Sequence, residues 1–127
     1  MNSFRKLNAY VNAKEMVKRV YALLKKFPKE EQYALCDQLR RAVVSIPSNI
    51  AEGCGRETQK DQTHFLTIAN GSLMEILSQL DVACDLGYIN KEEFESMEAL
   101  ITEEGKMISG MIKKRKKRVG WRLNDAH

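Results

Sequence analysis

The clearest helical pattern in the chain lies in residues 38–56, which read QLRRAVVSIPSNIAEGCGR. Apolar residues recur at spacings of three and four within this stretch and just upstream of it. They are Leu35, Leu39, Ala42, Ile46 and Ile50. Because an α-helix repeats every 3.6 residues, this spacing places all five on one face. The pattern predicts a helix with one buried side over residues 29–53.

Pro47 lies inside this predicted helix. A proline has no N–H to donate, and its ring clashes with the carbonyl four residues back, here that of Val43. The apolar spacing nevertheless continues to Ile50. We therefore expect a kink at Pro47 rather than a helix end, with the hydroxyls of Ser45 and Ser48 placed to help satisfy the freed carbonyl.

Three other segments show the same helical period, and no part of the chain alternates as a strand would. They cover residues 8–27, residues 59–86, and a stretch from about residue 90 past Met111. Short links between amphipathic helices favour an up-down arrangement. The sequence thus predicts an all-α fold, an antiparallel up-down-up-down four-helix bundle over residues 1–112, followed by a basic tail at 113–127.

Two helix starts carry capping signals. Thr58 is followed three residues later by Asp61, which is the spacing of a capping box. Asn90 precedes Glu92 and Glu93, whose negative charges suit the first turn of a helix. These signals predict that the last two helices begin just after Thr58 and Asn90.

Two places depart from a simple apolar stripe. Residues 70–72 read Asn-Gly-Ser in the middle of the third predicted helix, where low helix propensity would favour a break. Because the apolar period continues on both sides, we expect an unbroken helix and a close helix–helix contact there. Glu104 is the one charged residue in the apolar stripe of the fourth helix. We expect its carboxylate at the edge of the bundle, paired with a lysine of the first helix.

Charge is distributed unevenly along a chain whose net charge is +4. Residues 1–29 hold eight basic residues and one acidic residue, and so do residues 106–127. The middle, residues 30–105, holds fifteen acidic and five basic residues. Two basic ends therefore flank an acidic centre, a distribution that points to a polyanionic partner.

Signatures of catalysis and of metal binding are missing from the sequence. There is no glycine-rich phosphate loop, no Cys-x-x-Cys pair and no zinc-type histidine spacing. The widely spaced Cys36, Cys54 and Cys84 fit small buried positions in a reducing compartment. No apolar run approaches the roughly 20 residues of a membrane span. We expect a cytoplasmic protein that is not an enzyme and has no cofactor, no metal and no membrane association.

A run of six cations at residues 113–118 is the first candidate site. Consecutive cations repel one another and can bind phosphates, with release of counterions, while a nearby Trp121 could stack on a base. In an up-down bundle the end of the fourth helix lies near the start of the first. The candidate nucleic-acid-binding residues are Lys113, Lys114, Arg115, Lys116, Lys117, Arg118, Trp121, Arg122, Arg5 and Lys6. The alternative is a solvated, frayed tail.

A cluster of polar residues in residues 38–56 is the second candidate site. Four of its members step by four, three and four along one helix face, and Glu75 of the third helix is a possible ion partner. The cluster consists of Arg40, Arg41, Ser45, Asn49, Glu52, Arg56 and Glu75. Either it is a buried network that fixes helix register and accommodates Pro47, or it is a surface for a partner or ligand.

The same stretch resembles a bacterial family of four-helix bundle proteins encoded within intervening sequences of 23S rRNA genes. The resemblance covers about residues 7–111. The matching residues are those of 38–56, then Phe65-Leu66, Ala69, Gly71-Ser72-Leu73 and Glu75-Ile76, with Phe27-Pro28 and Leu86-Gly87-Tyr88-Ile89. The resemblance implies an antiparallel bundle that assembles as a homopentamer. It also implies similarity to the accessory variability protein of diversity-generating retroelements, a basic barrel that binds nucleic acid and reverse transcriptase.

The resemblance assigns no catalytic role to the motif residues, and the basic run lies outside the motif. The favoured function is therefore a non-catalytic, oligomeric bundle that binds RNA or DNA through the first helix and the end of the fourth. The alternative is a protein-interaction or structural accessory module with no direct nucleic-acid role. An enzyme or small-ligand carrier would require a deep pocket lined by Arg41, Glu52 and Glu75.

Overall fold

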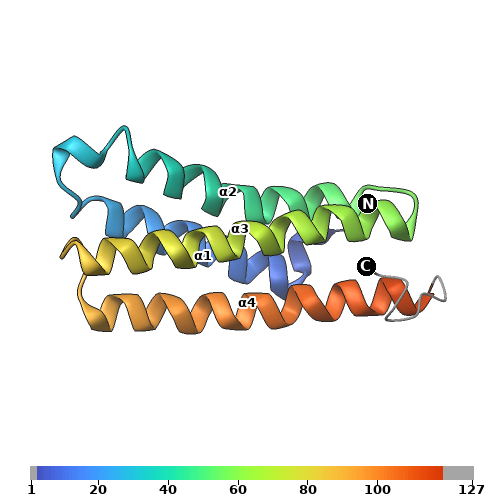
Figure 1. The fold of residues 1–127 in the computed structure, drawn as a ribbon. Coiled ribbons are helices and arrows are strands. Elements are labelled where there is room, and N and C mark those ends of the chain that lie inside the picture. Colours follow the sequence, from blue (N-terminus) through green and yellow to red (C-terminus); the bar gives the residue numbers. More distant parts are fainter. Residues whose placement is uncertain (1–2, 119–127) are drawn as a thin grey trace.

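The computed structural model of the protein describes residues 3–118, and four long α-helices account for most of that range (Figure 1). The helices are α1 (Asn8–Leu24), α2 (Leu35–Cys54), α3 (Gln59–Asp85) and α4 (Lys91–Arg118), with short 3-10 turns η1 (Phe4–Lys6) and η2 (Lys29–Glu31). No strand occurs between residues 3 and 118. The all-α prediction is confirmed. None of these helices is long and apolar enough to cross a membrane.

Each helix packs against two others, and the first and last helices are also neighbours. Helix α1 contacts α2 and α4, and α3 contacts the same two helices from the other side (Figure 1). The α2–α3 contact is the most extensive of the four, and the α1–α4 contact is the least extensive. This ring of neighbours agrees with the predicted up-down-up-down four-helix bundle.

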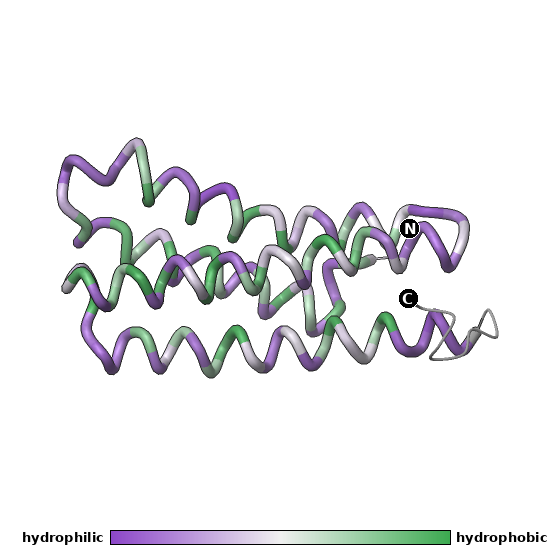
Figure 2. Tube along the Cα trace, viewed as in Figure 1, coloured by the Kyte–Doolittle hydropathy of each residue, from purple (hydrophilic) through white to green (hydrophobic). Residues whose placement is uncertain are grey.

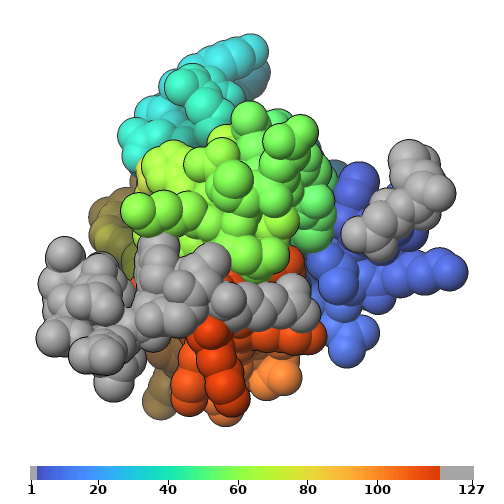
Figure 3. Space-filling view, turned by 90° about the vertical axis from the view of Figure 1, so that its right-hand side faces the viewer, coloured from blue at the N-terminus to red at the C-terminus, as the bar shows by residue number. Residues whose placement is uncertain are grey.

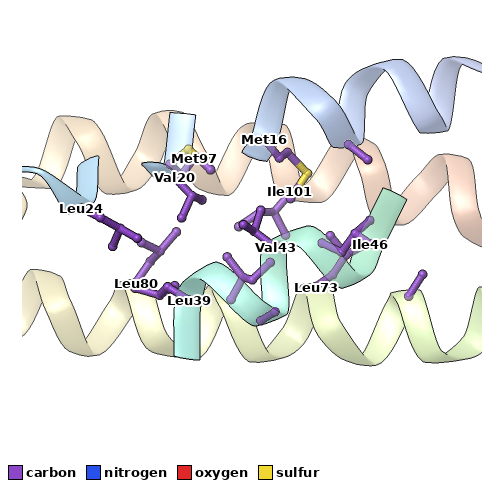
Figure 4. Packing of buried hydrophobic residues seen from close by; sticks show 14 of the residues in the cluster. Met16, Val20, Leu24, Leu39, Val43, Ile46, Leu73, Leu80, Met97 and Ile101 are labelled. Carbon is purple, nitrogen blue, oxygen red and sulfur yellow. The ribbon is translucent and has the colours of Figure 1, made fainter. Parts of the chain in front are cut away.

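The core is built from one apolar stripe on each helix. Figure 4 shows Met16 and Val20 of α1, Val43 of α2, Leu73 of α3 and Ile101 of α4 pointing into a shared interior. Burying a side chain of this size stabilises the folded chain by about 1.5–3 kcal/mol relative to leaving it in water. Figure 2 shows hydrophobic and hydrophilic residues alternating along every helix, with hydrophilic residues concentrated in the last turns of α4. The apolar residues that recur with the helical period in the sequence are therefore the ones that form the buried core.

Helix α2 begins at Leu35, six residues later than the predicted start at residue 29. Residues 29–31 form η2, and the side chain of Gln32 turns back to donate hydrogen bonds to the carbonyls of Leu24 and Phe27, each at 3.3 Å. Arg40 then donates to the Gln32 carbonyl at 3.1 Å and to its side-chain oxygen at 2.8 Å. The link satisfies the open carbonyls at the end of α1 instead of starting α2, which explains the late helix start.

Helix α2 continues through Pro47 to Cys54, as predicted from the apolar spacing. Ser45 donates to the carbonyl of Ala42 at 2.8 Å, one residue before the carbonyl of Val43 that the proline leaves open. Its Oγ also lies 2.5 Å from the Oγ of Ser72 on α3. A serine pair therefore joins α2 and α3 directly beside Pro47.

Helix α3 is unbroken through residues 70–72, but the small residues there have two different surroundings. Ser72 is buried against α2, which confirms the expected close contact. Gly71 is exposed, and a Cβ placed on it would meet nothing within 4 Å. The close-contact explanation is therefore right for Ser72 and wrong for Gly71, because the two residues lie about 100° apart around the helix.

Both predicted capping residues act as caps. The Thr58 hydroxyl accepts from the N–H of Asp61 at 3.0 Å. The Asn90 side chain accepts from the N–H of Glu93 at 2.7 Å, and the Glu93 carboxylate accepts from the N–H of Asn90 at 2.9 Å. This reciprocal pair satisfies two N–H groups that have no partner inside α4.

Candidate nucleic-acid interface

The basic run is a continuation of α4, which stays helical to Arg118. Lys113, Lys114 and Lys117 are exposed, and the helical repeat places them within an arc of about 100°. Three cations therefore lie on one face of the same helix. Of the other candidates, the side chain of Arg118 and the whole of Trp121 and Arg122 lie outside the described residues.

The start of the chain comes to the same end of the bundle. Ser3 and Phe4 line a cavity together with Arg115 of α4, so η1 and the end of α4 are neighbours. Figure 3 views this end directly and shows η1 in blue, the end of α4 in red and the α2–α3 link in green on a single face. Arg5 and Lys6 of η1 are exposed. The two basic segments, far apart in sequence, therefore lie at one end of the molecule, which we call the basic end.

The exposed cations of the basic end are not neutralised by acidic neighbours within residues 3–118. The ion pairs found there use the cations Arg19, Lys26, Arg40, Arg41 and Arg56. Lys113, Lys114, Lys117, Arg5 and Lys6 belong to none of them. Their charge is therefore available to a polyanion.

Arg115 has a different setting from its neighbours in the run. It is half-buried, its Nε donates to Oε1 of Gln62 at 2.9 Å, and its Nη1 donates to the Met111 carbonyl at 3.1 Å. Gln62 is itself fixed, since its Nε2 donates to the carbonyl of Arg56 at 2.9 Å. These bonds tie the last turns of α4 to the start of α3. Lys116 is also half-buried.

Lys106 is a further candidate cation that was not among the predicted site residues. It is exposed and precedes Lys113 by seven residues, or about two helical turns, so it lies on the face of α4 that carries Lys113 and Lys117. The spacing of 7 and 11 residues among these lysines could have revealed it.

The cations in and just after α1 divide into two groups. Arg19 of α1 bonds to Glu15 at 3.2 Å, and Lys26, two residues after the end of α1, pairs with Glu93 of α4. Lys14 and Lys18 instead line an open groove between α1 and α2, whose floor includes Val17. Some of these basic residues therefore form ion pairs, one of them with α4, and the others are exposed.

The polar cluster of residues 38–56 is largely engaged in helix packing. Besides its two bonds to Gln32, Arg40 donates to Asp37 at 2.9 Å. Asn49 donates to the Ser45 carbonyl at 2.7 Å, which satisfies a helix carbonyl two residues before Pro47. Arg56 pairs with Glu52 at 2.7 Å and covers the ring of Phe65 at 4.6 Å from its centroid. These contacts support the interpretation that the cluster fixes helix register.

Four members of the cluster are exposed, namely Arg41, Glu52, Arg56 and Glu75, and the polar contacts of Arg41 and Glu75 are the longest in the cluster. The side chain of Arg41 is 82% exposed, and its distance to Asp37 is 3.8 Å. Glu75 forms no ion pair in the described part of the chain and accepts a hydrogen bond from Gln79 at 3.4 Å. Arg41, Glu52 and Glu75 line neither the grooves between α1 and α4, nor the groove between α1 and α2, nor the cavity at the basic end.

Glu104 does not lie at the edge of the bundle as expected. It is fully buried, at 0% exposure, and its Oε1 accepts from the side-chain nitrogen of Asn12 on α1 at 2.9 Å. Its Oε2 has no hydrogen-bond partner among residues 3–118. Burial raises the pKa of Glu104 to about 7, although the Asn12 hydrogen bond acts in the opposite direction. The expected lysine partner is replaced by a neutral amide because the stripe position points straight into the core.

Comparison with known proteins adds a family and a fold. A model of the 23S rRNA-intervening sequence protein family matches residues 5–110, which include the polar cluster and end before Lys113. A crystal structure from Bacteroides thetaiotaomicron VPI-5482, of a protein with unknown function from the S23 ribosomal protein family, is similar with a TM-score of 0.77 and 25% identity. The alignment covers 83% of this chain and 98% of that one. No curated protein matches the sequence.

Proposed function

This chain belongs to the 23S rRNA-intervening sequence protein family, and we propose that it is a non-catalytic, oligomeric helical bundle that binds RNA or DNA through its basic end. The proposal places it in the cytoplasm. One observation carries it. Five exposed cations from two distant segments gather at one end, and none of them has an ion-pair partner within the described ranges.

Phosphate contacts give such a surface a defined behaviour. Each cation that neutralises a phosphate releases condensed counterions, so the logarithm of the affinity falls linearly with the logarithm of salt concentration, by about 0.9 per phosphate on a duplex. Phosphate contacts position a protein on a nucleic acid but do not read its sequence. Binding through the lysines of the basic end should therefore be strong at low salt and similar for all sequences.

The charge of the basic end is tested by replacing Lys113, Lys114 and Lys117 with glutamine. We expect the affinity for mixed-sequence RNA and DNA to fall at least about tenfold at 0.1 M salt, and the salt slope to shrink by about three. Fluorescence anisotropy over a salt series measures both quantities.

A matched control removes the same charge from the opposite end. Lys25, Lys29 and Lys91 are exposed and lie at the end of α1, in η2 and at the start of α4. Their replacement with glutamine should leave affinity nearly unchanged. Equal losses in both triple variants, or binding that ignores salt, would show that net charge or another surface is responsible.

Self-association is the second part of the proposal, and the outward face of α3 supports it. Ile68, Met74 and Val82 on this face are 39%, 59% and 47% exposed, and Gly71 between them faces open space. Apolar side chains aligned on one exposed helix face mark a contact surface. A second copy of the chain is the partner that the resemblance to a homopentameric family favours. A different protein on the same face would instead support the accessory-module alternative.

The outward face of α3 is tested with the double variant Met74→Glu and Val82→Glu. Two buried carboxylates would oppose any contact there, so we expect the mass in solution to drop to that of one chain. Light scattering after size exclusion gives the mass, and circular dichroism checks the helix content. A wild-type protein that is already monomeric, or a variant that keeps the full oligomer mass, would contradict this part of the proposal.

A further inference from the structure

A small cavity lies at the basic end, lined by three separate parts of the chain. Ser3 and Phe4 line it from the N-terminal side, Cys54 and Gln59 from the facing ends of α2 and α3, and Arg115 from α4. Its volume is about 250 Å³. Pockets for drug-sized ligands are roughly 300–1,000 Å³, so this cavity suits a single planar fragment rather than a long segment.

One side chain that lines the cavity, Gln59, carries a polar atom without a hydrogen-bond partner in the described part of the chain. The Oε1 of Gln59 is buried and has no hydrogen-bond partner between residues 3 and 118. Leaving such an atom unpaired costs about 1–3 kcal/mol, and buried polar atoms are ordinarily paired. The neighbouring Gln62 differs, because both ends of its amide are already engaged with Arg115 and Arg56. Gln59 lines the cavity. Its amide can therefore give an occupant a new hydrogen bond by turning about its last side-chain torsion.

The other walls favour a flat, aromatic occupant. Phe4 and Arg115 both line the cavity. The ring of Phe4 also makes an edge-to-face contact with Tyr10, at 4.9 Å between centroids, and two hydrogen bonds hold the guanidinium group of Arg115. Rings and guanidinium planes are the surfaces on which splayed-out bases stack, while side-chain amides read the edges of bases. A phosphate would be held more strongly by the exposed lysines of α4 than by a cavity with one cation and two amides.

We propose that this cavity takes up one unpaired nucleobase of a nucleic acid whose phosphates lie along the basic end. The inference rests on the proposed function and adds a preference within it, for single strands over fully paired duplexes. Stacking and edge contacts are worth about 1–3 kcal/mol per base, which corresponds to roughly 5- to 150-fold in affinity.

The decisive variant is Gln59→Leu, which removes the amide at nearly constant size and leaves the net charge unchanged. Its matched control is Gln79→Leu, since the Oε1 of Gln79 is likewise buried without a partner but lies farther along α3, away from the cavity. Binding of a 12-nucleotide single strand and of the corresponding duplex is measured by anisotropy at fixed salt. We expect Gln59→Leu to weaken single-strand binding at least fivefold and to leave duplex binding unchanged, while Gln79→Leu changes neither.

Two results separate this inference from the proposed function. Salt-dependent binding that Gln59→Leu leaves intact, or weakens equally for single strand and duplex, overturns the cavity and keeps the basic end. Neutral nucleosides such as adenosine and uridine probe the cavity without phosphates, through saturable shifts of the Gln59 side-chain NMR signals that Gln79 signals do not show. Such shifts support the cavity even if polynucleotides fail to bind, and their absence in the wild-type protein overturns it.

Discussion

The stability of this protein should fall by about 3 kcal/mol as the pH rises from about 4.5 to about 7, through Glu104 alone. The pKa of this buried carboxyl is raised from 4.5 to about 7, and a shift of one pH unit corresponds to about 1.4 kcal/mol. The folded protein therefore keeps the proton that the unfolded chain loses. Stability from this group is complete below about pH 4.5 and is gone once the pH exceeds about 7.

The variant Glu104→Gln isolates this effect from other carboxyls. Glutamine can still accept from Asn12 but does not titrate, so the variant should be more stable than wild type by about 3 kcal/mol at pH 8 and nearly equal to it at pH 4.5. Urea unfolding at several pH values gives both curves. Glu103→Gln, at an exposed position one residue away, is the control and should run parallel to wild type.

A constant difference between wild type and Glu104→Gln over this pH range would mean that Glu104 stays ionised in the folded protein. Other groups act in the opposite direction. The hydrogen bond from Lys26 lowers the pKa of Glu93, so that group contributes stability above its unfolded pKa and loses it in acid. Only the difference between the variants, rather than the wild-type curve alone, reports on Glu104.

Much of the fold could be predicted from local patterns. The apolar period at Leu39, Ala42 and Ile46 identifies a buried face because helix geometry relates sequence spacing directly to direction. The caps at Thr58 and Asn90 were also predictable, since a cap joins residues only three apart in sequence. These features depend on near neighbours, which a single sequence displays.

Features that depend on distant neighbours could not be predicted in the same way. Gly71 and Ser72 are adjacent small residues, yet only the position of α2 makes one a contact and leaves the other exposed. The buried Glu104 depends on Asn12, 92 residues away. The cavity at the basic end needs η1, the facing ends of α2 and α3, and α4 together, so neither Gln59 nor Phe4 could be singled out beforehand. The cations of residues 113–118 were evident, but the setting of Arg115 was not.

Replacing Gly53 with valine should destabilise the protein by about 3 kcal/mol, because α2 packs there directly against the backbone of α3. A Cβ at this position would lie 3.2 Å from the carbonyl oxygen of Gln62 and 3.3 Å from the Cβ of Phe65. The carbonyl belongs to the backbone of α3 and cannot turn aside, so α3 itself must shift. Urea unfolding of the variant measures the loss.

Gly71→Val is the matched control, as it makes the same change on α3 where nothing lies within 4 Å. Valine has a higher helix propensity than glycine, so this variant should be as stable as wild type or slightly more stable. Similar losses in both variants would mean that valine in a helix, rather than the approach of α2 to α3, sets the cost.

The substitution at Gly53 should also affect binding, because contacts run from Gly53 through Gln62 to Arg115 at the basic end. Gly53 lies against the backbone of Gln62, and the Gln62 side chain holds Arg115 of α4. A displaced Gln62 would release Arg115 and change the wall of the cavity without removing any charge. Under conditions where Gly53→Val stays folded, single-strand affinity should therefore fall while duplex affinity and the salt slope, which depend on the exposed lysines, remain those of wild type. An unchanged single-strand affinity in the folded variant would show that the motif glycine serves packing alone.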